Sequence, residues 1–515
     1  MSKAPQSQAL GASRYDVVII GGGINGTSAA RELTAAGYRV LLAEMSDLAN
    51  GASSRSSRIL HCGLRYFETP RPLRTFLSSP RRLAGAAGMA RAAMQARAEL
   101  SALRPEVCRP FTMCFPVYRG GAVAGWHLDL GFRLLAALGP ARPSLDYRRI
   151  ARDFDRHVPF AGDLRDRAHL HAIATYREYI IDSPDRLCVD AALEAERGGA
   201  ELRLFTRATI AGRAEAGGWR LHLSGRNGVE AVEAPVVLNL AGTWSDAVLA
   251  GIAPEPRTPL VTGTKGSHIV VRLPPRYAGH GIACLHRGGL PFYCLPLGGD
   301  LFCFGPTETP YEGDATEAVA TDEDVAFLLG EANFLLPGLR LRRSDIVFTW
   351  AGVRPLGFAA GQPMGRRVRT IHDLAERGLP GIFAMTAGPV MSHLSAGREL
   401  RDAVARVIPP SGRPPPRPLP RPDPGADGAE RLRRAVVAEH ARDLEGLLYT
   451  RTGLAWGRHL DRHAVASAAQ SVSDLLGWSP GEAARQVERF MQQQDSRFGR
   501  RAADGMSTAR MEAET

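Results

Sequence analysis

Residues 15–44 read YDVVIIGGGINGTSAARELTAAGYRVLLAE, an apolar run followed by closely spaced glycines and a second apolar run. Residues 16–20 form a short apolar run with β-branched side chains, as a strand buried on both faces requires. Glycines at the G-x-G-x-x-G spacing follow, and residues 27–36 are rich in helix formers, with Gly37 at the C-cap position. A second strand over residues 38–43 ends at Glu44. The order predicts a dinucleotide-binding βαβ unit.

Each part of this unit has a physical role in binding. The first glycine permits a tight turn, the second lets the backbone approach a pyrophosphate, and the third lets helix and strand pack closely. The pyrophosphate then lies at the positive end of the helix, and the acidic residue accepts hydrogen bonds from ribose hydroxyls. The alternative is a structural βαβ unit without a ligand. The predicted cofactor-binding residues of this unit are Gly21, Gly23, Ile24, Asn25, Gly26 and Glu44.

Length and composition set outer bounds on function. The 515 residues, 44% hydrophobic and 23% charged, are typical of a soluble chain with two or three domains. The sequence contains no run of about 18 uncharged apolar residues, so we expect no membrane-spanning helix. Seven scattered cysteines without a CxxC pair fit a reducing cytoplasm and predict no zinc site. We therefore expect a cytoplasmic protein without a metal centre.

The net charge of +11 bears on partners. No nucleic-acid-binding motif accompanies it, so we expect no nucleic-acid partner. An anionic substrate or an anionic membrane face is favoured instead. The alternative is a bias towards arginine in a GC-rich genome. Residues 126–138 (WHLDLGFRLLAAL) could lie at a membrane interface, and a buried core helix is the alternative interpretation.

Composition also predicts the domain organisation. Residues 409–424 are proline-dense and predict a semi-rigid linker. Helical patterns follow it, whereas helical and strand-like stretches alternate before it; strands are predicted at 201–205, 219–223, 234–240, 268–271 and 301–304. The predicted divisions are a disordered leader (1–14), an oxidoreductase core (15–408), a Pro-rich linker (409–428), a C-terminal helical domain (429–500) and a disordered tail (501–515).

A serine- and arginine-rich stretch, residues 50–68 (NGASSRSSRILHCGLRYFE), follows the strand that ends at Glu44. Ligands of α/β sheets bind at the carboxyl ends of strands, so Ser53 and Ser54 are predicted to bind phosphate or ribitol oxygens. A solvated surface loop is the alternative interpretation.

Four motifs in this order resemble the FAD-dependent glycerol-3-phosphate dehydrogenase family, within the D-amino-acid-oxidase-like flavoproteins. They are GGGINGTSAA, DLANGASSRSSRILHCGLRYFE, TGTKGSHIVV (262–271) and FTWAGVRPL (348–356). The resemblance covers residues 15–400, and residues 439–457 resemble the family's C-terminal helical domain. It implies an α/β fold with a Rossmann-type FAD-binding domain, an inserted β-rich substrate domain and a small all-α domain. It also implies FAD, hydride transfer from C2 of glycerol 3-phosphate, and electron delivery to membrane quinone.

Further site residues rest on these motifs. Arginine offers a planar fork that matches phosphate or carboxylate, so Arg65 and Arg354, with Tyr66, are predicted substrate ligands. Arg354 is also counted as catalytic. Alcohol oxidation needs a base, which we assign to His61; a packed core histidine is the alternative. The remaining predicted cofactor-binding residues, by resemblance, are Arg207, Ala208, Gly242 and Gly388.

One departure concerns the substrate. Where the family has G-G-K-L-T-T-Y-R, residues 387–394 read AGPVMSHL, so Pro389 replaces a lysine. His393 in this stretch is a predicted substrate ligand. The first hypothesis is a quinone-linked glycerol-3-phosphate dehydrogenase, and the second is a flavin enzyme for another hydroxy acid or an amine. A flavin-binding protein with little catalysis is the third. We expect peripheral attachment to the cytoplasmic membrane face, and we count a homodimer among the partners, although the sequence does not fix the oligomeric state.

Overall fold

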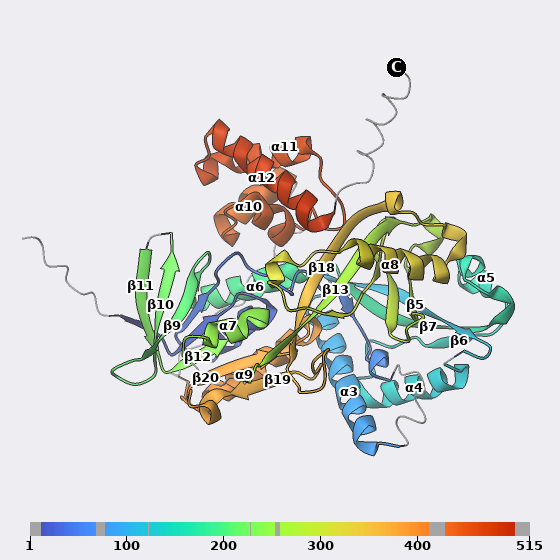
Figure 1. Ribbon diagram of the computed structural model, residues 1–515, viewed down its shortest axis with the longest axis horizontal. Helices are drawn as coiled ribbons and strands as arrows, with labels where there is room; N and C mark the ends of the chain where they lie inside the picture. Colours follow the sequence, from blue (N-terminus) through green and yellow to red (C-terminus); the bar gives the residue numbers. More distant parts are fainter. Residues whose placement is uncertain are drawn as a thin grey trace, which may run out of the picture.

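The computed structural model describes residues 12–67, 78–121, 123–226, 228–252, 258–410 and 428–499 (Figure 1). Most of the predicted leader (1–14) and linker (409–428), and the whole predicted tail (501–515), lie outside the described residues. Those three assignments, and the domain limits drawn from them, stay predictions.

A six-stranded sheet carries the glycine-rich turn at its centre. Its strands run parallel except for the edge strand β19, which pairs antiparallel with β20. In spatial order they are β19 (Thr370–Asp373), β20 (Ile382–Thr386), β12 (Val236–Asn239), β2 (Val17–Ile20), β3 (Val40–Ala43) and β8 (Glu201–Arg203). All four residues of β2 are buried, as the apolar run predicts.

The alternation of side chains along β2 explains the layers of this domain. Val17 and Ile19 pack against helices α1 (Ile24–Ala35), α6 (Pro184–Arg197) and α9 (His393–Ala405). Val18 and Ile20 face the opposite way, towards a four-stranded sheet and helix α7 (Ser245–Leu249). The strands of that sheet, on the left in Figure 1, are β1 (Ser13–Arg14), β11 (Gly228–Ala234), β10 (Trp219–Gly225) and β9 (Arg207–Arg213).

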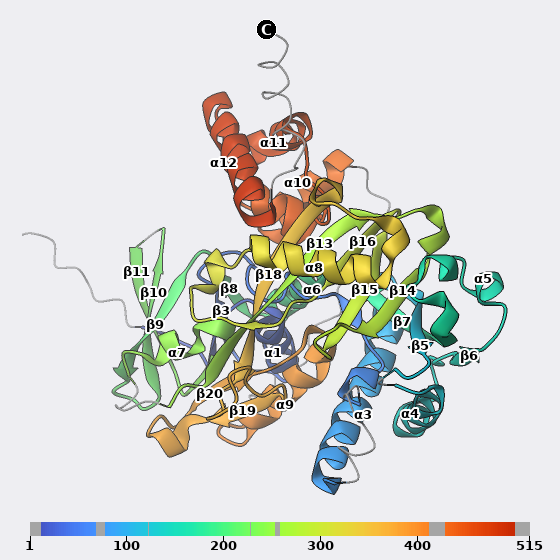
Figure 2. The ribbon, with the colours of Figure 1, turned by 45° about the vertical axis from the view of Figure 1, so that its right-hand side comes forward.

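A ten-stranded sheet forms the second half of the molecule, on the right in Figure 1. Its longest pairings join β13 to β18 and β5 to β7, both antiparallel. Helix α8 (Asp322–Leu335) packs on it, and helices α3 (Pro80–Leu103) and α4 (Gly125–Leu138) project from its lower edge (Figure 2). The strands are β4 (Ile59–Leu60), β5 (Cys108–Tyr118), β6 (Arg148–Ile150), β7 (Leu170–Ile181), β13 (Val261–Arg272), β14 (His280–Leu285), β15 (Pro291–Gly298), β16 (Leu301–Gly305), β17 (Thr309–Pro310) and β18 (Ile346–Gly357).

The C-terminal helices lie together above the two sheets in Figure 1. They are α10 (Gly428–Glu439), a π-helix (Gly446–Arg451), α11 (Arg462–Leu476) and α12 (Pro480–Phe498). Their apolar residues share one core with the ten-stranded sheet, where the ring of Phe498 stacks on Phe348 at 4.9 Å between centroids. The region is therefore packed onto the core by aromatic contacts.

The predicted fold class is confirmed: an α/β protein with a Rossmann-type sheet, a β-rich second sheet and a C-terminal helical region. The five predicted strands correspond to β8, β10, β12, β13 and β16. The segment predicted as a helix from residue 126 is α4. Among the described helices, none combines the length and the apolar character needed to cross a membrane.

Candidate active site and cofactor cavity

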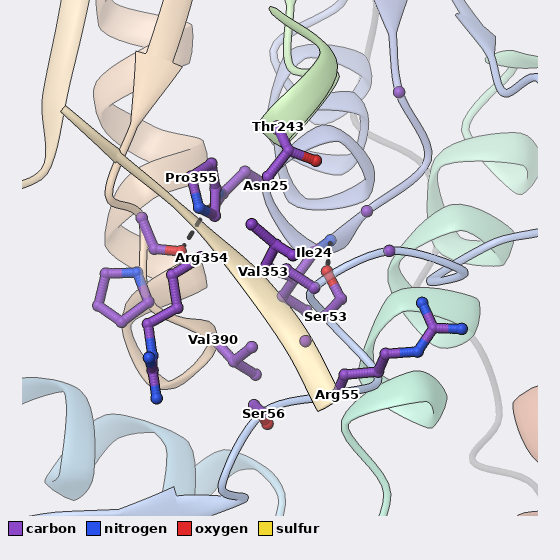
Figure 3. A pocket seen from close by; sticks show the side chains of 18 of the residues that line it. Ile24, Asn25, Ser53, Arg55, Ser56, Thr243, Val353, Arg354, Pro355 and Val390 are labelled. Atoms are coloured by element: carbon purple, nitrogen blue, oxygen red, sulfur yellow. Dashed lines mark hydrogen bonds between the residues drawn. The ribbon is translucent and has the colours of Figure 1, made fainter. Parts of the chain in front are cut away.

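A cavity of about 750 Å³ opens where the two large sheets meet (Figure 3). The residues at or just past the ends of β2, β3 and β12 line one side, and residues of β13 and β18 line the other. Ligands of open α/β sheets bind outside the carboxyl ends of the strands. The cavity therefore lies where the βαβ unit predicts a dinucleotide.

The glycine turn at one end of the cavity has no room for side chains. Gly21 has a φ of +112°, and a Cβ added there would lie 2.6 Å from the carbonyl oxygen of Leu240. A Cβ on Gly26 would lie 1.9 Å from the carbonyl oxygen of Gly21, so helix α1 can approach β2 only with glycine at this position. Gly23 caps the helix and lines the cavity. This geometry fits a bound pyrophosphate at the helix N-terminus.

Glu44 lies beside this turn and is held by its surroundings. Its carboxylate accepts a hydrogen bond from the Gly22 N–H at 2.6 Å and two from Ser46, at 2.8 Å from N–H and 2.9 Å from the hydroxyl. Burial raises the pKa of Glu44, whereas these hydrogen bonds act in the opposite direction. Both Ser46 bonds go to Oε1, so Oε2, which accepts only the Gly22 N–H, keeps acceptor capacity that a ribose hydroxyl can use.

The start of α1 is tied to two loops that also line the cavity. The Ser53 hydroxyl accepts the N–H of Ile24 at 3.0 Å. Asn25 donates to the carbonyl of Gly388 at 3.4 Å, and its own carbonyl oxygen is buried without a hydrogen-bond partner (Figure 3). An unsatisfied buried acceptor is a place where a ligand donor is expected.

The other predicted cofactor-binding residues lie in two groups. Arg207 and Ala208 at the start of β9, and Gly242 with a φ of +61°, line the cavity. Ser54 does not, because its hydroxyl donates to the Gly51 carbonyl at 3.2 Å within the loop. Gly26 is also absent from the cavity wall, since its role is to let α1 pack on β2.

The opposite end of the cavity is cationic. Arg65, Arg354 and Arg367 all line it, from three separate segments. Burial, and to a smaller extent Arg65, lower the pKa values of Arg354 and Arg367 to about 10, so both remain charged at neutral pH. Within the described structure the Arg354 side chain donates no hydrogen bond to the protein, and its Nη1 is buried. A buried guanidinium nitrogen without an acceptor, beside other arginines, is a place where an anion is expected.

Two glycines on neighbouring strands leave room for the side chain of Arg354 and for the loop that carries Arg55. Gly266 on β13 pairs with Gly352 on β18. A Cβ on Gly266 would lie 2.4 Å from Nη2 of Arg354, and a Cβ on Gly352 would lie 2.7 Å from the Cβ of Arg55. The paired strands can therefore lie directly behind the cavity wall.

His61 and Tyr66 stand between the two ends. Their rings meet edge to face at 5.5 Å between centroids, and both line the cavity. Among the described residues, Nδ1 of His61 is buried without a hydrogen-bond partner. Burial, with a smaller contribution from Arg65, lowers the pKa of His61 to about 3. The imidazole is therefore neutral at physiological pH, and the cavity without a ligand disfavours its protonated form.

Two further histidines have different surroundings. His268 lines the cavity, accepts or donates a hydrogen bond with the Ser57 hydroxyl at 2.9 Å, and stacks on Trp350 at 4.5 Å. His393 lies behind α1, where its Nδ1 meets the Ser28 hydroxyl at 2.8 Å, and it does not line the cavity. The prediction that His393 binds substrate is therefore not carried forward: the imidazole faces the packing between α1 and α9.

Sequence reasoning missed a pair at the cationic end. Glu308 lines the cavity and forms an ion pair with Arg367. Arg367 lies in an arginine-rich turn after the G-V-R-P-L motif, and its side chain is 36% exposed. The turn itself was a signal for Arg367, but nothing local to Glu308 indicated its partner. The pair reduces the positive charge that a substrate meets.

Comparisons with known proteins agree with this architecture. The family described as DAO, FAD dependent oxidoreductase, matches residues 16–403. A glycerol-3-phosphate dehydrogenase from Synechocystis sp. is 27% identical over 469 residues, covering 88% of this chain and 78% of that protein. An aerobic glycerol-3-phosphate dehydrogenase from Staphylococcus haemolyticus is 28% identical over 398 residues, covering 76% of this chain and 67% of that protein.

Solved structures share the fold at low identity. The glycerol-3-phosphate dehydrogenase of Bacillus halodurans, complexed with FAD, has a TM-score of 0.67 at 18% identity and covers 95% of this chain and 96% of that one. Glycine oxidase from Geobacillus kaustophilus has a TM-score of 0.56 at 21% identity and covers 77% of this chain and 95% of that one. With the glycine turn, Glu44 and the cavity, these matches show that FAD is the cofactor and that the chain belongs to the FAD-dependent oxidoreductase (DAO) family.

Proposed function

We propose that this protein oxidises sn-glycerol 3-phosphate to dihydroxyacetone phosphate, with electrons passed to quinone. The names of the relatives support the substrate. The observation that carries the proposal is the cationic end of the cavity, where Nη1 of Arg354 is buried without an acceptor in the described structure. A phosphate monoester is the anion that best compensates several convergent arginines.

The residues around the cavity divide the chemistry among them. Arg65 and Arg354 hold the phosphate, which fixes the position of the carbon to be oxidised. His61, neutral because of its burial, takes the proton of the C2 hydroxyl as the C2–H bond breaks. FAD, when bound, supplies the oxidant that accepts the hydride. The alcohol thus loses one proton and one hydride, and the product is the ketone.

A second candidate function rests on charge. Pro389 lines the cavity where the resembling family has lysine, and Glu308 offsets Arg367. Arg65 and Arg354 alone suit one carboxylate better than a doubly charged phosphate. The second candidate is therefore oxidation of a hydroxy acid or an amino acid.

Anaerobic reduction of the FAD-loaded protein separates the two candidates. Loss of the oxidised flavin absorbance is followed with glycerol 3-phosphate, glycerol, lactate, glycine and proline, each added in separate samples. Reduction by glycerol 3-phosphate and none of the others supports the first proposal. Reduction by an acid or amine alone supports the second, and reduction by none contradicts both.

We also propose that the protein attaches to the cytoplasmic face of the membrane through α4, where quinone would be reached. Trp126 and Leu130 on this helix are 52% and 56% exposed, and Arg133 is exposed beside them. Apolar side chains with a nearby cation suit the boundary of an anionic bilayer. The other side of α4 packs in the core through Leu128, so the core-helix interpretation applies to that side.

Flotation with vesicles tests the attachment. The FAD-loaded protein is mixed with vesicles of phosphatidylglycerol and phosphatidylcholine at low salt. We expect it to float with the vesicles, and a Trp126→Ser, Leu130→Ser variant to remain below. If the unaltered protein also remains below, the membrane proposal is wrong. The exposed Val437→Ser on α10 is the matched control.

A further inference from the structure

The loop that follows β3 is held between the glycine turn and the C-terminal helices. Residues 44–58, named here the cofactor segment, include Glu44 and Ser53, which line the cavity. Asp47 faces the C-terminal helices instead, and Arg55 and Arg58, which also line the cavity, lie near charged or aromatic residues of that region. The segment therefore has one side for the cofactor and another for the helical region.

The strongest of these contacts joins Asp47 to Arg451, which lie 404 residues apart in the sequence. Arg451, in the π-helix, is 0% exposed, and its Nη1 forms an ion pair with the Asp47 carboxylate. Its Nε also donates to the carbonyl of Glu439 at 2.9 Å, at the end of α10. The other Asp47 oxygen accepts the N–H of Leu48 at 2.7 Å, which turns the segment.

The π-helix is shaped to receive this carboxylate. A Cβ on Gly446 would lie 2.2 Å from Oδ2 of Asp47, so only glycine leaves room for the pair. The N–H of Gly446 donates to Asp443 at 2.8 Å, which fixes this turn of the helix. The close approach is thus built into the backbone as well as into the charges.

The inner side of the segment is fixed to the glycine turn. Glu44 accepts the N–H of Gly22 at 2.6 Å, and the N–H of Ala49 donates to the Gly22 carbonyl at 3.1 Å. Asp47 lies between these two attachments in the chain. A shift of Asp47 towards solvent would therefore move the groups that shape the turn for a pyrophosphate.

Two arginines extend the same arrangement along the segment. The guanidinium of Arg58 lies 4.5 Å from the ring centroid of Trp456 and donates to the Asp182 carbonyl at 2.8 Å. Arg55 extends away from Arg354 (Figure 3) and lies in the field of Glu445, which itself pairs with Arg497 on α12. The contacts with Trp456 and Glu445 again join the cofactor segment to the C-terminal region, whereas Asp182 follows β7.

We propose that the C-terminal helices are a positioning element for FAD, and that Arg451 acts on the cofactor through Asp47. A buried ion pair adds little net stability compared with apolar packing, but removing one partner leaves an uncompensated charge. The pair therefore allows one location of the segment and penalises others. The helices would accordingly govern how tightly FAD is held, independently of which substrate is oxidised.

The test is the FAD dissociation constant of an Arg451→Met variant of the full chain. We expect that constant to rise about 10- to 100-fold, as for the loss of a charge-assisted hydrogen bond. Dilution of the loaded protein, followed by the fluorescence of released FAD, gives the value. At saturating FAD, KM for the reducing substrate should stay within about twofold of the unaltered value, because the pair does not touch the cationic end.

Matched variants separate positioning from general destabilisation. Lys265→Met breaks another buried ion pair, with Asp324 at 2.7 Å, outside the cavity wall. It should lower the melting temperature and leave the FAD dissociation constant unchanged. The double variant Asp47→Asn, Arg451→Met removes both charges and should hold FAD more tightly than Arg451→Met alone. If Arg451→Met does not fold, Arg451→Lys, which keeps the charge, should show a smaller rise.

Two results would overturn the proposal. One is a folded Arg451→Met or Arg451→Lys protein whose FAD dissociation constant equals that of the unaltered protein. The other is a Lys265→Met protein that loses FAD as readily as the Arg451 variant does, which would assign the effect to stability alone. Neither result depends on the identity of the substrate, so the proposed function would be unaffected.

Discussion

The two ends of the central cavity handle their polar groups in opposite ways. At the nucleotide end, Glu44 and Ser53 are hydrogen bonded to backbone groups of the turn they support. At the cationic end, Arg354 has no protein acceptor in the described structure, and Nδ1 of His61 has no partner. Apart from the unpaired side-chain carbonyl of Asn25, the first end is built from satisfied hydrogen bonds to the backbone, whereas the second keeps a charged group and an imidazole nitrogen for a ligand.

This difference implies different sensitivities to mutation. The nucleotide end should fail when a side chain occupies space that the backbone needs. The cationic end should keep its fold and its FAD when a charge is removed, and lose only affinity for the substrate.

The largest effect is expected at Gly26. In Gly26→Ala, the new Cβ would lie 1.9 Å from the Gly21 carbonyl oxygen, so α1 must move from β2. We expect the purified protein to lack FAD and to lose about 1–3 kcal/mol or more of unfolding free energy. Absorbance at 450 nm relative to 280 nm and urea unfolding measure the two effects.

Gly88→Ala is the control for that variant, because a Cβ at Gly88 in α3 meets nothing within 4 Å. It should retain FAD and gain slightly in stability through helix propensity. A Gly26→Ala protein with a full FAD complement would refute the close-packing account of the turn.

Removal of Arg354 should produce the next largest effect. Arg354→Ala is expected to raise KM for the anionic substrate about 10- to 150-fold while FAD stays bound, since a charge-assisted hydrogen bond to a buried anion is lost. Arg354→Lys should recover only part, because an ammonium cannot reproduce the guanidinium fork. Steady-state kinetics with a dye acceptor gives the values.

Arg272→Ala is the matched control on the same pair of strands, since Arg272 forms an exposed ion pair with Asp300. Its KM should be unchanged. An unaltered KM in Arg354→Ala would mean that the substrate does not bind at the cationic end.

A smaller gain is expected from added positive charge. Pro389→Lys should lower the dissociation constant of glycerol 3-phosphate about fivefold, because the added charge contributes roughly 1 kcal/mol of interaction near the surface of the cavity. Glu308→Gln should act in the same direction by releasing Arg367 from its ion pair. If both variants weaken glycerol 3-phosphate, or tighten a carboxylate more than a phosphate, the second candidate function gains support.

The smallest effect is expected from pH. Burial and Arg65 lower the pKa of His61 to about 3, so the imidazole stays neutral as pH falls from 8 to 5. An unperturbed histidine, with a pKa of about 6.5, would lose roughly 30-fold in its neutral form by pH 5. After correction for the second ionisation of the substrate phosphate, kcat/KM should therefore be flat over this range. A fall in kcat/KM centred near pH 6.5, absent in His61→Asn, would contradict the lowered pKa of His61.

The contrast between the two ends also explains what the sequence could predict. The nucleotide end uses contiguous glycines whose roles follow from backbone geometry, so the turn and Glu44 were identified from spacing alone. Arg65 and Arg354 were found only through the resemblance of their motifs to a known family. His393 was predicted in the stretch that departs from the family pattern, and the structure directs it to Ser28 and not to the cavity.

Other features depend on strand register and on contacts between distant segments. Gly266 accommodates Arg354 only because it pairs with Gly352 across β13 and β18. The ion pair of Glu308 with Arg367 and that of Asp47 with Arg451 join residues far apart in the chain. No local pattern encodes such pairs, so they became visible only in three dimensions.

The most direct test of the account is the rate of flavin reduction with glycerol 3-phosphate carrying deuterium at C2. Loaded protein and substrate are mixed rapidly without oxygen, and the decay of the oxidised flavin absorbance is recorded. We expect full reduction, slowed by a primary isotope effect relative to the substrate with ordinary hydrogen at C2. No reduction by either form of glycerol 3-phosphate, with bleaching by a hydroxy acid or an amino acid, would contradict it.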